Sequence, residues 1–125
     1  MQRIPILQLG EYLLTSIQVD LTDRDVNQFQ EDALNIVART DAKAMAIDIT
    51  ALGVVDSYMA RVLNDTADMI SLLGLEVVIC GMQPEVAITL TEMGRELVGV
   101  ETALNLERGL EKLKDAVARR EHRDG

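Results

Sequence analysis

Hydrophobic and polar residues follow one another in blocks that predict strands and helices. Residues 4–9 and 12–19 are two strand-like runs joined by Gly10-Glu11, and a two-residue link beginning with glycine is typical of a type II′ hairpin. Apolar residues then recur at spacings of three and four, which predicts a helix at about 23–39. Thr22 has an acidic residue three positions later, the spacing of a capping box at the start of that helix.

The same analysis predicts further elements after this helix. In chain order they are a buried strand, a long helix, a second buried strand, a short helix and a final helix, at about 44–49, 57–73, 76–80, 84–93 and 107–120. Pro84 suits the first position of the short helix, and Gly94 suits its C-terminal cap. A last short strand is expected at 97–100 or in a neighbouring stretch.

This order of elements predicts an α/β fold built on one central sheet. Strands that alternate with helices favour a sheet that is parallel at its centre, and the opening hairpin adds an antiparallel edge. The expected sheet is therefore mixed, with an N-terminal β-hairpin and about four helices. Because no linker or repeat interrupts the chain, we expect a single domain over residues 1–118 and a loose, charged tail over 119–125.

Composition narrows the classes of function. The chain has 125 residues, of which 48% are apolar and 26% charged, as in an ordinary soluble domain. Twelve basic and 21 acidic residues give a net charge of −9, which disfavours binding to nucleic acid. No run reaches the roughly 18 apolar residues of a membrane span, and no signal peptide is evident. We therefore expect a cytoplasmic protein that binds neither nucleic acid nor membrane.

Residues that commonly carry catalysis or bind metals are scarce. Cys80 lies in an apolar strand, where an inert core thiol is expected, and a single cysteine excludes a multi-thiolate metal site. The only histidine, His122, lies in the charged C-terminal segment, so a Ser-His-Asp or Cys-His arrangement is not supported. The glycines form no phosphate-binding motif. The sequence indicates a protein that is not an enzyme, with no cofactor and no metal.

The segment 53–59, which joins a buried strand to an amphipathic helix, is the strongest candidate site. Asp56 or Ser57 is placed to cap the helix by accepting a bond from its first N–H groups. A second interpretation is a phosphorylation switch, in which phosphate on Ser57 lies over the positive end of the helix. Further along, Asp65 and Asp68 are expected to share a solvated polar face with Arg61 and Asn64.

Three segments resemble the STAS-domain family, which includes the anti-sigma-factor antagonists. They are 56–63, 74–90 and 4–8, and the stretch Gly-x-Gln-Pro-x-Val-Ala at 81–87 is the most specific. The resemblance extends along essentially the full chain and is closer to the single-domain, RsbS-type scaffolds of the stressosome. Tyr58 and Met59 stand where simple antagonists carry small residues, which disfavours direct binding of an anti-sigma kinase in their manner.

The resemblance implies a STAS fold and a non-enzymatic scaffold that is a phosphorylation substrate in stress signalling. Ser57 would be phosphorylated by an RsbT-type serine/threonine kinase, which is then released, and an RsbX-type phosphatase would reset the site. RsbR-type STAS paralogues are implied partners in a large hetero-assembly, and a homo-oligomer, expected as a dimer, is also implied. The implied kinase-binding surface comprises Asp56, Tyr58, Arg61, Asn64, Asp65 and Asp68.

Two other classes of function stay open at this point. A free anti-sigma-factor antagonist would bind an anti-sigma kinase one-to-one. A receiver-like module would need a metal-dependent aspartyl phosphate, for which Asp48 at a strand end is the weak candidate. Thr22 lies near a second phosphorylatable position of the RsbR-type proteins, and we interpret it as a helix cap.

Overall fold

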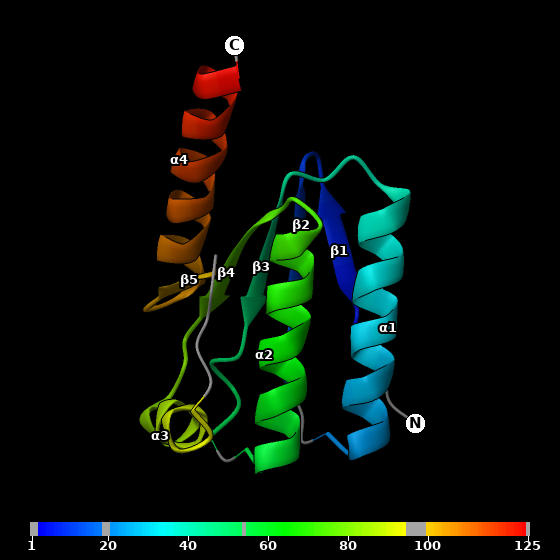
Figure 1. Cartoon of the computed structure of the whole chain (residues 1–125), viewed down its shortest axis with the longest axis vertical. Coiled ribbons are helices and arrows are strands. Elements are labelled where there is room, and N and C mark those ends of the chain that lie inside the picture. The colour runs from blue at the N-terminus through cyan, green and yellow to red at the C-terminus, as the bar shows by residue number, and fades with distance from the viewer. Residues whose placement is uncertain (1–2, 19–20, 54, 95–99, 125) are drawn as a thin grey trace.

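A computed structural model describes residues 3–18, 21–53, 55–94 and 100–124. Strands and helices alternate along these ranges after an opening pair of strands (Figure 1). In order they are β1 (Ile6–Leu9), β2 (Tyr12–Ser16), α1 (Asp23–Arg39), β3 (Ala44–Asp48), α2 (Ser57–Leu72), β4 (Glu76–Cys80), α3 (Pro84–Glu92), β5 (Val100–Ala103) and α4 (Leu106–Asp124).

The strands form one five-stranded sheet in the order β1-β2-β3-β4-β5. β1 is antiparallel to β2, whereas the other neighbours are parallel. Leu9 pairs with Tyr12 across the hairpin, and Gly10 has the positive φ of 59° that glycine adopts without strain. The predicted mixed sheet, with an N-terminal hairpin and four helices, is therefore confirmed.

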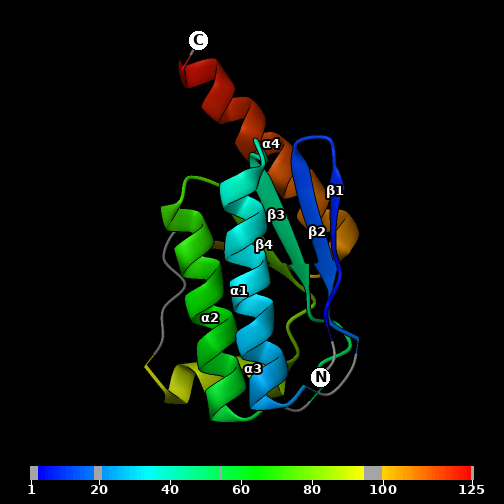
Figure 2. The same ribbon diagram turned by 90° about the vertical axis from the view of Figure 1, so that its right-hand side faces the viewer.

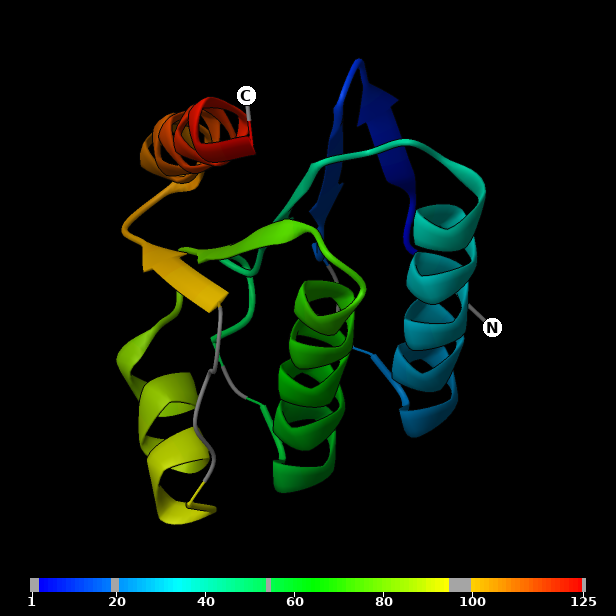
Figure 3. The same cartoon turned by 45° about the horizontal axis from the view of Figure 1, so that its top comes forward.

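Helices cover both faces of this sheet, with α4 alone on one side and the other helices opposite (Figure 3). Alternate residues of β3 point to the two sides, so Met45 and Ile47 join the larger core with α1 and α2. Ala44 and Ala46 point the other way and pack with Leu113 of α4. The strong apolar content of the inner strands follows from this burial on both faces.

Close approach of α4 to β4 depends on a small residue. A Cβ added at Gly109 would lie 2.3 Å from Cys80 Sγ, so glycine is required where the helix crosses the strand. Cys80 is fully buried, as expected, and burial raises the pKa of its thiol to about 11. The thiol therefore stays protonated at neutral pH, consistent with a core residue.

The C-terminal part of the chain differs from the prediction. β5 begins at Val100 in the neighbouring stretch, and residues 97–99 lie outside the described part of the chain. α4 continues to Asp124, so residues expected in a loose tail from 119 are helical (Figure 2).

Long-range contacts hold this helical extension on the body of the domain. Lys43 donates a hydrogen bond to Glu121, and this bond, together with one that Lys43 donates to Glu11, raises the pKa of the lysine above its ordinary value. Arg120 donates to the Gly74 carbonyl oxygen.

Two elements end earlier than predicted. The second strand was expected at 12–19, but β2 ends at Ser16, and Val19 lies outside the described residues. The long helix was expected to end at about 73, but α2 ends at Leu72; Leu73 is 57% exposed, and Gly74 follows with φ 104°.

Candidate functional site

The loop between β3 and α2 is ordered by its own first residues. Asp48 ends β3, and its Oδ1 accepts hydrogen bonds from the Thr50 backbone N at 3.0 Å and from Thr50 Oγ1 at 2.6 Å. Asp48 Oδ2 also accepts from Ser16 Oγ at 3.4 Å. The carboxylate considered for a receiver-like site therefore serves as a turn acceptor in this loop.

Gly81 and Gln83 of the Gly-x-Gln-Pro-x-Val-Ala stretch, which follows β4, contact this loop. A Cβ at Gly81, where φ is 73°, would lie 1.9 Å from Thr50 Oγ1. Gln83 Nε2 donates to the Thr50 carbonyl oxygen at 2.8 Å, and the same side chain lies against Gly53. Pro84 then begins α3. These contacts link the motif to the loop that leads into the candidate site, a connection that sequence reasoning missed.

The carboxylate of Asp56 caps α2. The residue has the extended backbone of an N-cap, with φ −74° and ψ 167°, and its Oδ1 accepts a hydrogen bond from Met59 N at 2.8 Å. Ser57 is therefore the first helical residue, and it is exposed. Among the described residues, none forms a hydrogen bond with its hydroxyl. The cap and the candidate phosphate acceptor are thus two different residues.

Tyr58 connects this helix start to α1. Its Oη donates to Asn27 Oδ1 at 2.8 Å, and the tyrosine is half-buried between the two helices. The guanidinium carbon of Arg61 lies 5.3 Å from the centroid of the Tyr58 ring, within range of a cation–π contact. Asp56, Ser57, Tyr58 and Arg61 therefore form one surface at the start of α2.

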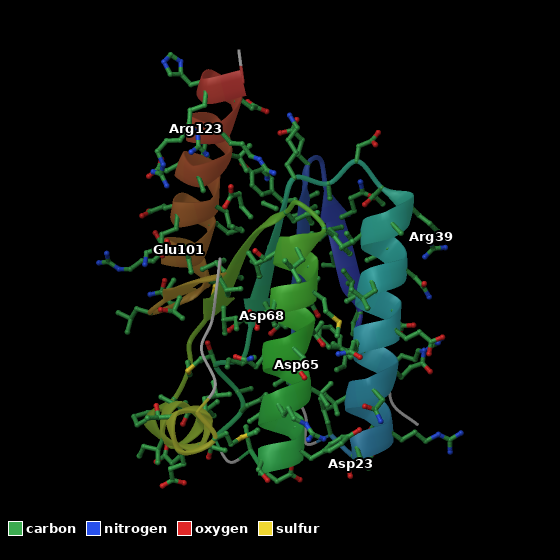
Figure 4. The ribbon with its side chains drawn as sticks, viewed as in Figure 1. Asp23, Arg39, Asp65, Asp68, Glu101 and Arg123 are labelled. Atoms are coloured by element: carbon green, nitrogen blue, oxygen red, sulfur yellow. The ribbon has the colours of Figure 1, made fainter. Side chains whose placement is uncertain are left out.

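Asn64 does not lie on this surface, which corrects the prediction that it belongs to a solvated polar face. Only 3% of Asn64 is exposed, because α3 packs beside α2 and the residue lines a small cavity with Val86 and Leu90. Its Nδ2 donates to Asp68 Oδ2 at 3.3 Å. Asp65 and Asp68 are half-buried and lie along α2 beyond its first turn (Figure 4).

The rest of the described structure adds no metal-type cluster. Among the described residues, no three His, Cys, Asp or Glu side chains are grouped as a metal site would require. In the same part of the chain, no helix combines the length and apolar character needed to cross a bilayer.

The family model of the STAS domain matches residues 3–108. The chain belongs to the STAS-domain family. Among solved structures of similar chains, RsbS from Moorella thermoacetica, in a variant with a serine replaced by glutamate, is 45% identical. The match covers 92% of this chain and 97% of that one, with a TM-score of 0.83.

Two further comparisons point in the same direction. A solved structure described as the molecular architecture of the stressosome, a signal integration and transduction hub, is 47% identical to this STAS domain. It covers 90% of this chain and 98% of its own, with a TM-score of 0.79. The RsbT co-antagonist protein RsbRA of Bacillus subtilis is 27% identical over 108 residues, which are 86% of this chain. This chain spans 39% of the length of RsbRA.

Proposed function

We propose that this STAS domain is a non-enzymatic scaffold and phosphorylation-switch substrate of a cytoplasmic stressosome-type complex. The observation that carries the proposal is that Asp56 caps α2 while Ser57, the next residue, is exposed. Similarity to RsbS over nearly the full length of both chains supports the scaffold role. Similarity to a chain in a stressosome structure and to RsbRA supports assembly with RsbR-type paralogues.

The proposed phosphate acceptor is Ser57, and the proposed enzyme is an RsbT-type serine/threonine kinase that uses ATP as the phosphate donor. Ser57 is exposed at the first helical position, while Asp56 accepts the hydrogen bond from Met59 N. A phosphate there adds about −1.5 to −2 charges beside the Asp56 carboxylate. The N-terminal end of the helix dipole and Arg61, four residues further on, offset part of that charge.

Release of the kinase follows from this local change of charge. The proposed kinase-binding surface starts with Asp56, Tyr58 and Arg61 and continues along α2 with Asp65 and Asp68. A phosphate on Ser57, at the start of this surface, alters the electrostatic match with the kinase and lowers the affinity. Buried Asn64 contributes by holding Asp68. An RsbX-type phosphatase then restores the binding state.

The test is phosphorylation by an RsbT-type kinase with ATP and Mg²⁺, with and without an RsbR-type partner, followed by peptide mapping. We expect stoichiometric, acid-stable phosphate on Ser57, and its loss in Ser57→Ala. Thr22→Ala is the matched control, because it removes a hydroxyl at the neighbouring helix start and should leave phosphorylation unchanged. Phosphate on another residue of Ser57→Ala, or none on the native chain, contradicts the proposal.

Assembly is tested separately by sizing the chain mixed with an RsbR-type protein. A large complex that retains the kinase before phosphorylation is the expected result. A small one-to-one complex with an anti-sigma kinase, in place of the large assembly, would instead identify a free antagonist.

A further inference from the structure

The loop between β3 and α2 leads directly to Ser57, and apolar side chains anchor parts of it. Ile49, Leu52 and Val55 are 3%, 3% and 7% exposed, so they hold the loop in the core. Thr50 is exposed and Gly53 is half-buried. Core packing therefore leaves these two positions of the loop to other contacts.

The side chain of Gln83 supplies contacts at both positions. Its Nε2 donates to Thr50 O at 2.8 Å, and the two residues are 33 positions apart in the chain. A Cβ added at Gly53 would lie 3.6 Å from Gln83 Oε1 and 4.0 Å from its Nε2, so the amide group lies against that backbone. One side chain thus spans the first half of the loop.

Gln83 makes these contacts from a position where a side chain usually serves its own helix. It is the N-cap residue of α3, with φ −82° and ψ 155°, yet its side chain forms no capping hydrogen bond. The preferred N-cap residues are asparagine, aspartate, serine and threonine, whose short side chains reach the free N–H groups of the first turn. The glutamine at this position therefore suits the contact with the loop and not the start of α3.

The backbone on both sides of Gln83 is held in place. Before it, Gly81 packs closely against Thr50, and Gly81 N donates to Ala103 O of β5 at 2.9 Å. After it, Pro84 has its φ fixed by its ring and begins α3, which packs beside the start of α2 (Figure 1, Figure 2). The Gln83 amide consequently extends from a fixed turn onto the loop.

We propose that Gln83 is a positioning residue for phosphorylation of Ser57, an inference that rests on the proposed function. By holding Thr50 and Gly53, it fixes the path of the loop into α2 and with it the position of the Ser57 hydroxyl. In the part of the chain that the structure describes, no side chain binds this hydroxyl, so the backbone sets its position.

The transfer reaction is sensitive to that position. The Ser57 oxygen bonds to the γ-phosphorus of ATP, the bond from that phosphorus to the leaving oxygen of ADP breaks, and the serine proton passes to a base of the kinase. The attacking and leaving oxygens must lie roughly in line, and a displacement of about 1 Å slows such a reaction strongly. A looser loop is therefore expected to lower the rate of transfer.

The positioning role predicts an effect on kcat and not on KM. The proposed kinase-binding surface continues along α2 through Tyr58 and Arg61, and the contacts of Gln83 lie on the preceding loop. Binding of the kinase should therefore persist when Gln83 is changed. What is lost is the orientation of the Ser57 hydroxyl in the bound complex.

Gln83→Asn separates positioning from a merely structural role. Asparagine is a preferred N-cap, so α3 should begin at least as well, but the shorter side chain no longer reaches Thr50 O. We expect the urea midpoint to be unchanged or raised, and kcat to fall about threefold to tenfold, the range for one neutral hydrogen bond. Steady-state phosphorylation by an RsbT-type kinase with ATP and Mg²⁺ measures kcat and KM.

Two further variants complete the comparison. Gln83→Met keeps the length of the side chain but has no donor, so kcat should fall as it does in Gln83→Asn. Thr91→Ala is the matched control, because it removes a hydrogen bond to Ala87 O within α3 and touches no part of the loop. Its kcat should equal that of the native chain. Hydrogen exchange of the amides at 50–53 should be faster in the two Gln83 variants and unchanged in the control.

The outcomes distinguish this inference from the function on which it rests. If the native chain and Gln83→Asn are phosphorylated with equal kcat, the positioning role is wrong and the switch stands. If KM rises while kcat is unchanged, Gln83 contributes to kinase binding, and the positioning role is again wrong. If the native chain takes no phosphate under any condition, the proposed function fails and this inference fails with it.

Discussion

The starts of α1 and α2 lie at the same end of the domain, yet they use a hydroxyl residue in opposite ways (Figure 1). In α1, Thr22 is the N-cap: its Oγ1 accepts from Asp25 N, and its own N donates to Asp25 Oδ2, both at 3.1 Å. In α2, Asp56 is the N-cap and Ser57 follows it. The Thr22 hydroxyl therefore caps its helix, whereas Ser57 is exposed to solvent.

This difference shows why a hydroxyl at a helix start does not by itself define a phosphorylation site. A capping box satisfies two backbone N–H groups at once, and modification of the Thr22 hydroxyl would disrupt the bond that it accepts from Asp25 N. Where a carboxylate caps the helix, the side chain of the next residue is not needed to bind the helix N–H groups. The predicted capping box at Thr22 is confirmed. The choice between Asp56 and Ser57 as cap, open from the sequence, is decided for Asp56.

The largest effect is expected from adding charge at one helix start and not at the other. Ser57→Asp should weaken binding of an RsbT-type kinase by about tenfold or more, which corresponds to about 1.4 kcal/mol. Thr22→Asp is the matched control, since it adds one negative charge at the α1 start and still provides a good cap. Calorimetric titration compares both with the native chain. Equal weakening by the two variants would mean that net charge, not position, controls the affinity.

Removing the cap of α1 should cost more stability than removing the Ser57 hydroxyl. Thr22→Ala is expected to lower the free energy of unfolding by about 1 kcal/mol, because Asp25 N loses its acceptor. Ser57→Ala should change it by less than about 0.5 kcal/mol, since Asp56 retains the cap. Urea unfolding followed by circular dichroism measures both. Similar losses in the two variants would show that Ser57 has a capping role.

The cap of α2 can be tested by changing the charge without removing the acceptor. Asp56→Ala should cost about 1 kcal/mol of unfolding free energy, and Asp56→Asn only a few tenths, because asparagine also caps well. The difference between the two variants isolates the hydrogen bond to Met59 N from the interaction of charge with the helix dipole. If Asp56→Asn costs as much as Asp56→Ala, the charge is the stabilising part.

Much of the fold could be predicted because burial leaves a periodic signal. α1 was placed at its observed bounds, Asp23–Arg39, by a regular apolar stripe, and β4 by a short apolar run. The sequence placed β5 only at 97–100 or in a neighbouring stretch, because its centre, Glu101 and Thr102, is exposed and shows no such run. The last turns of α4 were missed because their contacts are long-range, as in the pair of Lys43 and Glu121.

The candidate site was predictable only where it depends on neighbouring residues. Asp56 and Ser57 could be recognised from the strand–loop–helix pattern around them. The burial of Asn64 could not, because it depends on α3 packing beside α2. Gln83 stands 33 positions from the loop residue that it binds, so no local pattern connects them. The contact of Tyr58 with Asn27 was missed for the same reason.

That last contact joins the two helix starts, and it provides the smallest and most specific test. Tyr58→Phe removes the hydrogen bond to Asn27 Oδ1 while leaving the ring under Arg61. Because this hydrogen bond is exposed to solvent, a loss of about 0.5 kcal/mol of unfolding free energy is expected. Asn27→Ala removes the same bond from α1. In a double-mutant cycle the two losses should be non-additive by about the energy of that bond. Strict additivity would show that the helix starts are independent, and a phosphate at one would then leave the other unaffected.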